Sequence, residues 1–258
     1  MDKKMKKYDL HMHSYYSPCS RNKPEEILKA AKRAGLNGIA ITDHDSISCY
    51  LVLKKLNKDK NFEIICGEEI HTQHGDIIAL YLKKEIKSRD FFMAVKEVHS
   101  QGGIVIIPHP HRQVYWHKFK YPLSKLKGKI DAIETFNSRN TNKANRKAIA
   151  EAEKNGFAQT GSSDGHLIFD IGKGYTMFPA NMTLKEAIRN KKTVPGGNNN
   201  FGTISALVSA FYKRILTPLF GMRTDKYDQN EVLRQKNKSN LKDKKRKYQV
   251  LNAGKLKK

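Results

Sequence analysis

The chain has 258 residues, of which 38% are hydrophobic, and a formal net charge of +24. This length permits one large domain or one domain with an appendage, and the absence of any run near 18 apolar residues excludes an ordinary transmembrane helix. Cys19, Cys49 and Cys66 are scattered, which excludes a disulfide framework and a CxxC site and leads us to expect a reducing, cytoplasmic setting.

The positive charge is distributed along the whole chain. Residues 222–258 carry a net charge of +9, and the preceding residues carry +15. Such a field favours polyanionic partners such as nucleic acids, nucleotides or anionic membranes. A general preference of the proteome for lysine is the alternative explanation, because lysine far outnumbers arginine.

The motif D-L-H-M-H at residues 9–13 is the first chemically informative stretch. Tyr8 and Leu10 are the apolar positions expected of a short buried strand. Because His11 and His13 are two residues apart, both imidazoles would leave one face of that strand. Two neutral imidazoles on one face can begin a metal site. A pair of hydrogen-bonded core histidines is the alternative.

Helices and strands then alternate along the chain. A capping pattern at residues 22–25 and an apolar stripe predict a helix that Gly35 ends. Further helices are predicted at 47–56, 91–101 and 141–155, and a second capping box at 183–186 opens a short one. Strands are predicted at 38–42, 62–66, 76–81, 104–107, 130–134 and 157–161.

Several of these strands are continuous apolar runs, which is typical of parallel β/α units buried on both faces. About seven such units in roughly 190 residues favour an α/β barrel or near-barrel over an open sheet. Polar motifs follow the apolar runs at residues 42–45, 67–69, 108–111 and 163–166. Because the carboxyl ends of barrel strands meet at one mouth, we expect these motifs to converge there.

The C-terminal part has a different character. Residues 195–200 are interpreted as a linker, and the apolar spacing over 204–220 predicts an amphipathic helix. We expect that helix to pack against the barrel, with contact to a membrane surface as the alternative. The Lys-rich stretch after Gly221 is expected to be mobile. The chain is therefore divided into a domain at 1–197 and a C-terminal helix and tail at 198–258.

The motifs HMH, TDH, GEE, PHPH and SSDGH, in this order, resemble those of the PHP (polymerase and histidinol phosphatase) superfamily over about residues 7–195. The resemblance implies a distorted (β/α)7 TIM-like barrel with two or three divalent metal ions, manganese, zinc or iron, at its mouth. It implies metal ligands at His11, His13, His44, Glu69, His109, Asp164 and His166. Glu69 would bridge two metals, with Glu68 the less suitable choice, and Asp43 would bind metal or orient an imidazole.

Two positions depart from the family pattern. Cys19 stands where the family usually has Asp or His. As a thiolate it can bind zinc, but it is a poor ligand for manganese or magnesium. Asp76 is aligned where many members carry a histidine. Either change could reduce three metals to two or alter the preferred metal.

A phosphate ester also needs cationic partners, and Arg112 and Arg139 are expected on the same face. Lys173 is a weaker candidate. His111 is interpreted as a metal ligand, a general acid for the leaving group or a loop residue. His71 could share the face of Glu69. Surface positions are expected for His74, His99 and His117.

The sequence thus predicts a metal-dependent phosphoesterase in which a metal-bridging hydroxide attacks the phosphorus atom. Its substrate would be a nucleotide, a small phosphomonoester or an oligonucleotide end. The alternative is a non-catalytic nucleic-acid-binding protein that uses the basic surface and tail. Membrane contact through residues 204–220 is a third hypothesis.

Overall fold

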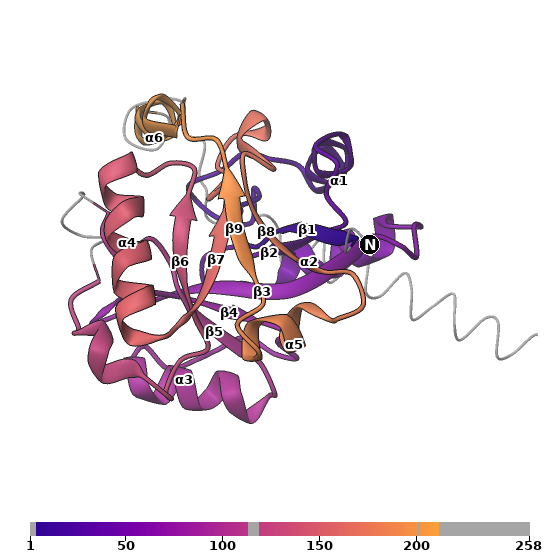
Figure 1. The fold of residues 1–258 in the computed structure, drawn as a ribbon. Helices are drawn as coiled ribbons and strands as arrows, with labels where there is room; N and C mark the ends of the chain where they lie inside the picture. The colour runs from indigo at the N-terminus through magenta and orange to yellow at the C-terminus, as the bar shows by residue number, and fades with distance from the viewer. Residues whose placement is uncertain (1–3, 113–118, 201, 212–258) are drawn as a thin grey trace, which may run out of the picture.

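One mixed sheet of nine strands organises the part of the chain that the computed structural model describes, residues 4–112, 119–200 and 202–211 (Figure 1). In spatial order the strands are β7 (Ala158–Ser162), β6 (Ala132–Asn137), β5 (Ile104–Ile107), β4 (Gly75–Leu80), β3 (Glu63–Thr72), β2 (Gly38–Ile41), β1 (Met5–Asp9), β8 (Gly174–Pro179) and β9 (Val194–Gly197). The helices are α1 (Pro24–Arg33), α2 (Ser48–Leu56), α3 (Phe91–Ser100), α4 (Asn142–Asn155), α5 (Leu184–Arg189) and α6 (Gly202–Phe211), with 3-10 turns η2 (Leu123–Leu126) and η3 (Ile168–Asp170).

Parallel pairing holds within two groups of strands, β1–β2–β3 and β5–β6–β7. Between these groups β4 runs antiparallel to both β3 and β5, so the expectation of parallel units throughout is wrong at this strand. The physical reason is the connection: only Gln73 and His74 separate β3 from β4. Two residues suffice for a hairpin but not for a crossover helix.

The sheet curls into a nearly closed barrel, as the sequence predicted. Its two end strands β7 and β9 approach each other (Figure 1), and glycines permit the close contact. A Cβ atom added to Gly161 of β7 would lie 3.1 Å from the amide nitrogen of Gly196 on β9 and 2.5 Å from the carbonyl oxygen of Tyr175 on β8. One added to Gly174 of β8 would lie 2.0 Å from the carbonyl oxygen of Ser162 on β7. The hydroxyl of Thr176 also links β7 to β8, since it donates to the Gly161 carbonyl at 2.8 Å.

Strands β8 and β9 were not expected from the sequence. Val194–Gly197 pairs antiparallel with β8, which itself pairs antiparallel with β1. The interpretation of 195–200 as a linker is therefore wrong for its first three residues. Proline and glycine make β9 resemble a loop in sequence, but they suit an edge strand that touches neighbouring backbone closely.

The apolar runs are buried on both sides of the sheet. Along β5, Ile104 and Ile106 pack inside the barrel with Ala132 of β6 and with α5. The alternate residues Val105 and Ile107 pack against α3 on the outside. Side chains alternate between faces in a strand, so burial of both faces explains why these strands are continuously apolar.

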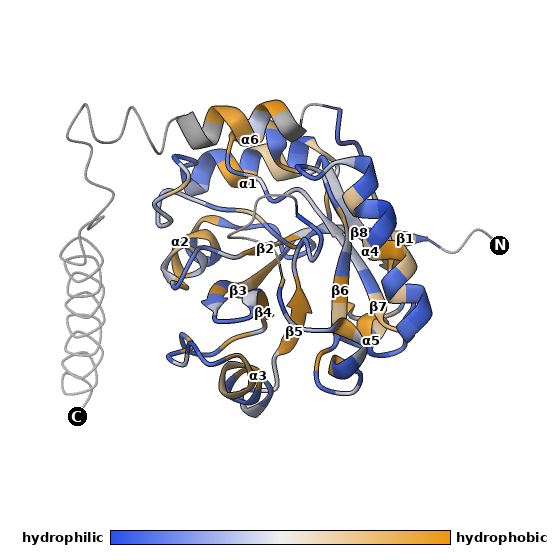
Figure 2. Ribbon diagram, turned by 90° about the vertical axis from the view of Figure 1, so that its left-hand side faces the viewer, coloured by the Kyte–Doolittle hydropathy of each residue, from blue (hydrophilic) through white to orange (hydrophobic). Residues whose placement is uncertain are grey.

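Helix α6 lies across one end of the barrel (Figure 2). It is attached by Ser205, which is buried and donates a hydrogen bond of 2.6 Å to Asp170. Ile204, Leu207 and Val208 are 54%, 71% and 38% exposed, so within the described turns the apolar stripe does not pack against the barrel as expected. Residues 212–220 of the predicted helix lie outside the described residues. Among the described helices, none has the length and hydropathy needed to cross a bilayer.

Candidate metal centre

The polar motifs meet at the carboxyl ends of the barrel strands. Strand β1 ends at Asp9, before the HxH motif, so the expectation that both histidines lie within the strand is wrong. The chain nevertheless stays extended: Met12 forms a bridge with Gly165, and the His13 amide donates to the Gly165 carbonyl at 2.9 Å. The two imidazoles converge, with their Nε2 atoms 3.3 Å apart.

Glu69 lies at the middle of the cluster. Its Oε2 atom is 3.4 Å from Nε2 of His11, 3.2 Å from Nε2 of His13 and 3.3 Å from Nδ1 of His44. Its Oε1 atom is 3.3 Å from Nε2 of His109. One carboxylate thus faces four imidazoles, which is the arrangement needed for a bridging ligand.

Backbone pairing brings His44 to Glu69. Beyond the end of β2, His44 still pairs with Glu69 in parallel register, and the Glu69 amide donates to the Asp43 carbonyl at 3.1 Å. The neighbouring Glu68 points the other way, because successive side chains alternate across a strand. It accepts a hydrogen bond of 3.0 Å from the Ile86 amide.

Asp164 approaches the same two N-terminal histidines as Glu69. Its Oδ1 atom is 3.5 Å from Nε2 of His11 and 3.6 Å from Nε2 of His13. The backbone φ angles of Asp164 and His109 are +52° and +29°. Such angles are uncommon for residues other than glycine, and they occur here at two positions whose side chains enter the cluster.

Four groups of side chains place their candidate ligand atoms within 4.8 Å of one another. They are His13 with Cys19 and His166, His11 with His13 and Glu69, His11 with His109 and Asp164, and Glu69 with Asp76 and His109. These groups contain seven of the predicted ligands, together with Asp76, and His44 joins them through its contact with Glu69. Their role as ligands remains a prediction.

The donor set fits divalent cations. Imidazole nitrogens and carboxylate oxygens are usual ligands of zinc, manganese and iron, and here the nitrogens of His11 and His13 face each other as well as the carboxylates. Burial opposes protonation of His11, yet Asp164, Glu69 and Glu134 raise the pKa of His11 to about 10. The same cluster holds the pKa of His44 at about 9, against the effect of burial, chiefly through Glu69. A bound cation would take the place of these protons among the carboxylates.

Glu134 on β6 is a positioning residue that the sequence analysis missed. Its Oε1 atom lies 3.2 Å from Nδ1 of His11, on the side of the ring away from the cluster. Its Oε2 atom accepts hydrogen bonds from the His109 amide at 2.7 Å and from the Asn137 amide group at 2.8 Å. The available signal was a carboxylate inside the apolar run of β6, where burial requires a partner.

Asp43 lies outside the four groups. Its carboxylate accepts hydrogen bonds from the amide and hydroxyl of Ser14, at 2.7 and 2.6 Å, and from the hydroxyl of Ser17 at 2.8 Å. Ser17 in turn lies 3.4 Å from Nδ1 of His13. Of the two roles left open for Asp43, the geometry therefore favours orienting an imidazole over binding metal.

Both predicted arginines lie at this mouth of the barrel. The Arg112 guanidinium forms an ion pair with Asp164, and Arg139 contacts the Asp164 backbone oxygen at 3.3 Å and the His166 ring. Burial is the largest influence on His166, and together with Arg139 and His13 it lowers the pKa of His166 to about 4. A neutral imidazole is the form that binds metal.

The remaining candidates lie outside the cluster. His111 forms an ion pair with Glu151 at 2.9 Å and belongs to none of the four groups. His71 is largely exposed, but its Nδ1 atom lies 2.6 Å from Asp76. His74 contacts aromatic rings, His99 pairs with Asp131, and Lys173 is exposed. His117 lies outside the described residues.

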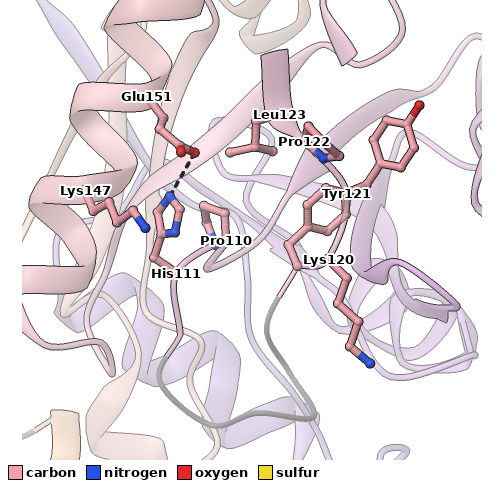
Figure 3. A pocket seen from close by; sticks show the side chains of 9 residues that line it. Pro110, His111, Lys120, Tyr121, Pro122, Leu123, Lys147 and Glu151 are labelled. Atoms are coloured by element: carbon pink, nitrogen blue, oxygen red, sulfur yellow. Dashed lines mark hydrogen bonds and ion pairs between the residues drawn. The ribbon is translucent and has the colours of Figure 1, made fainter. Parts of the chain in front are cut away.

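A pocket of about 460 Å³ adjoins the cluster. Figure 3 shows it between His111 and Lys147 on one side and Pro122 and Leu123 on the other. The turn 109–112, closed by a hydrogen bond from the Arg112 amide to the His109 carbonyl, separates the two. His109 and Arg112 face the cluster, whereas Pro110 and His111 line the pocket.

Comparison with known proteins gives a consistent result. The model of the PHP domain family matches residues 9–175. Two uncharacterized proteins of Methanocaldococcus jannaschii, MJ1587 and MJ0417, are each 35% identical to this chain. The first match covers 51% of this chain and 82% of the relative, and the second covers 67% and 70%.

Two crystal structures show the same fold at low sequence identity. A two-domain protein from Bacteroides vulgatus containing a predicted PHP-like metal-dependent phosphoesterase has a TM-score of 0.65 at 21% identity, over 76% of this chain. That match spans 65% of the other protein, which is less than two thirds of its length. PsfC from Pseudomonas syringae has a TM-score of 0.61 at 19% identity, over 82% of this chain and 99% of PsfC.

Proposed function

This chain belongs to the PHP domain family, and on that premise we propose that it is a metal-dependent hydrolase of phosphate esters. The observation that carries the proposal is Glu69, whose two carboxylate oxygens lie 3.2–3.4 Å from nitrogens of four histidines. A carboxylate in this position can hold two cations at the short separation that phosphoryl transfer requires.

One set of side chains in the cluster would bind cations, and the two arginines would bind the phosphate. Two or three divalent ions would be held by the histidines together with Glu69, Asp164, Asp76 and Cys19. Such ions polarise a phosphate ester and lower the pKa of bound water. Arg112 and Arg139, which already contact Asp164, can turn their guanidinium groups toward phosphoryl oxygens.

We infer a nucleotide or the end of an oligonucleotide as the substrate class. The net charge of +24 favours polyanions, and the neighbouring pocket has apolar walls suited to a planar base. Pro110, Pro122 and Leu123 supply those walls, while Lys147 and His111 place polar groups at the edge. A small phosphomonoester, which would not need this pocket, is the other substrate to be tested.

The test of hydrolysis uses the full chain with Mn²⁺ or Zn²⁺ and three substrates: glycerol phosphate, nucleoside monophosphates and end-labelled oligonucleotides. We expect phosphate release or end trimming that falls to background in Glu69→Gln. The control is Glu153→Gln, an exposed carboxylate on α4. Activity retained by Glu69→Gln, or absent from the metal-loaded wild type on all three substrates, would contradict the proposal.

The pocket is tested separately with Lys147→Ala, which removes an exposed side chain at its edge. If the base occupies the pocket, this change raises KM for nucleotides and leaves KM for glycerol phosphate unchanged. Equal changes for both substrates would place the base elsewhere.

A non-catalytic role in nucleic-acid binding is the second candidate, because the basic charge extends through the whole chain. That role requires oligonucleotide binding that weakens with salt. It also requires the binding to persist in His11→Ala and His44→Ala while no substrate is hydrolysed.

A further inference from the structure

One sulfur atom stands among the nitrogen and oxygen donors of the centre. Cys19 shares a group with His13 and His166, with all three ligand atoms within 4.8 Å of one another. Its thiol is also in electrostatic contact with the imidazole of His44. One sulfur and three nitrogens therefore lie at this end of the cluster.

The opposite end has a different chemistry. The group of His109, Glu69 and Asp76 and the group of His109, His11 and Asp164 contain only oxygen and nitrogen donors. Glu69 and Asp164, which belong to these two groups, also contact Nε2 of His13 at 3.2 and 3.6 Å and so connect the two ends. The centre is thus graded from a sulfur-containing end to a carboxylate-rich end.

Ligand type decides which ion prefers which end. Thiolate is a soft ligand that favours zinc and disfavours manganese and magnesium, whereas carboxylates suit the harder ions. A thiolate with two or three imidazoles is a usual donor set for zinc in a tetrahedral site.

We propose that Cys19, His13 and His166, with His44 beside them, form a zinc-selective position within a mixed-metal centre whose carboxylate-rich end accepts manganese. This inference rests on the proposed function only in that both concern the same centre. It concerns which ion occupies each position and makes no use of hydrolysis.

The experiment replaces the native ions of the full-length chain with Co²⁺ by dialysis and records the absorption spectrum. A thiolate bound to Co²⁺ gives sulfur-to-metal charge transfer in the near ultraviolet, which nitrogen and oxygen ligands do not give. We expect this band in the wild type and its loss in Cys19→Ser and in Cys19→Asp. The matched control is Cys66→Ala, a buried cysteine on β3 outside the four groups, and it should keep the band.

Metal content provides the second measurement. After dialysis against Mn²⁺ in large excess over Zn²⁺, which offsets the higher affinity of zinc for nitrogen and oxygen ligands, the wild type should retain both ions. Cys19→Ser should lose about one zinc per chain while keeping manganese. Cys19→Asp, which restores an oxygen donor, should exchange that zinc for manganese. Circular dichroism checks that each variant is folded.

The outcomes separate this inference from the proposed function. A charge-transfer band without any hydrolysis would support the zinc position and contradict the phosphoesterase. Hydrolysis by a Co²⁺-loaded chain that lacks the band, or equal zinc retention by the wild type and Cys19→Ser, would overturn the zinc position and leave the phosphoesterase intact.

Discussion

The carboxylate of Glu134 lies 3.2 Å from Nδ1 of His11, although the two residues are 123 positions apart in the chain. Glu134 is buried, and the same carboxylate accepts the backbone amide of His109. It therefore fixes two members of the cluster at once: the ring of His11, whose Nε2 is directed toward Glu69 and Asp164, and the backbone of His109. Partners of this kind raise the basicity of a histidine ligand and set its tautomer.

We expect Glu134→Gln to weaken metal binding by about 10- to 100-fold, the usual effect of removing such a partner. The amide retains the shape of the side chain but removes the negative charge that faces His11. Competition with a chromophoric chelator measures the affinity. Glu153→Gln on the exposed face of α4 serves as the control, and an affinity equal to that of the wild type in Glu134→Gln would contradict the assigned role.

Removal of metal should lower the melting temperature. Without cations, the buried carboxylate of Glu69 depends on His11 and His44 for compensation, and that of Asp164 depends chiefly on Arg112 and then on His11. Ions at 100 times their dissociation constant would stabilise the chain by about 2.7 kcal/mol, or several degrees for a domain of this size. Scanning calorimetry with and without EDTA tests this. A Glu69→Ala chain should respond less than the wild type, and equal responses would argue for ion binding elsewhere.

The glycine contacts that close the barrel make a prediction about stability. In Gly174→Ala, the new Cβ would lie 2.0 Å from the oxygen and 2.3 Å from the carbon of the Ser162 carbonyl. Because both contacts are backbone, β7 and β8 must separate, and we expect a loss of about 3 kcal/mol or more. Gly156→Ala, at the left-handed end of α4 (φ 68°), should cost only about 1 kcal/mol. Urea unfolding compares the two, and similar losses would contradict the closure described above.

Ser205→Ala should weaken the attachment of α6 to the barrel without loss of metal from the centre. The substitution removes a hydrogen bond to the Asp170 carboxylate, and bonds to charged groups contribute about 1.5–3 kcal/mol. Asp170 still accepts the amides of His166 and Leu167, at 3.2 and 3.0 Å, so the His166 loop keeps its support. We expect faster proteolysis near α6 and unchanged metal content. Ser100→Ala, at the exposed end of α3, is the control, and loss of metal from Ser205→Ala would show that α6 also supports the centre.

Local sequence patterns were sufficient to predict most of the helices and strands of the fold. The apolar runs of β2 and β5 and the glycine ends of α1 and α4 lie where the sequence predicts them. The direction of β4 and the existence of β8 and β9 were not predictable in this way. Their pairing depends on which strands lie next to one another, and neither the period of the side chains nor local turn chemistry contains that information.

The sequence by itself determined which residues could form the centre, because histidines and carboxylates that follow buried strands must reach the mouth of a barrel. Only the tertiary structure decided how they are used. Asp43 accepts hydrogen bonds from two serines, and His111 pairs with Glu151. Glu134 lies behind His11, and Cys19 lies beside His13 and His166. These assignments depend on distances between segments far apart in the chain, which are set by strand register and barrel closure.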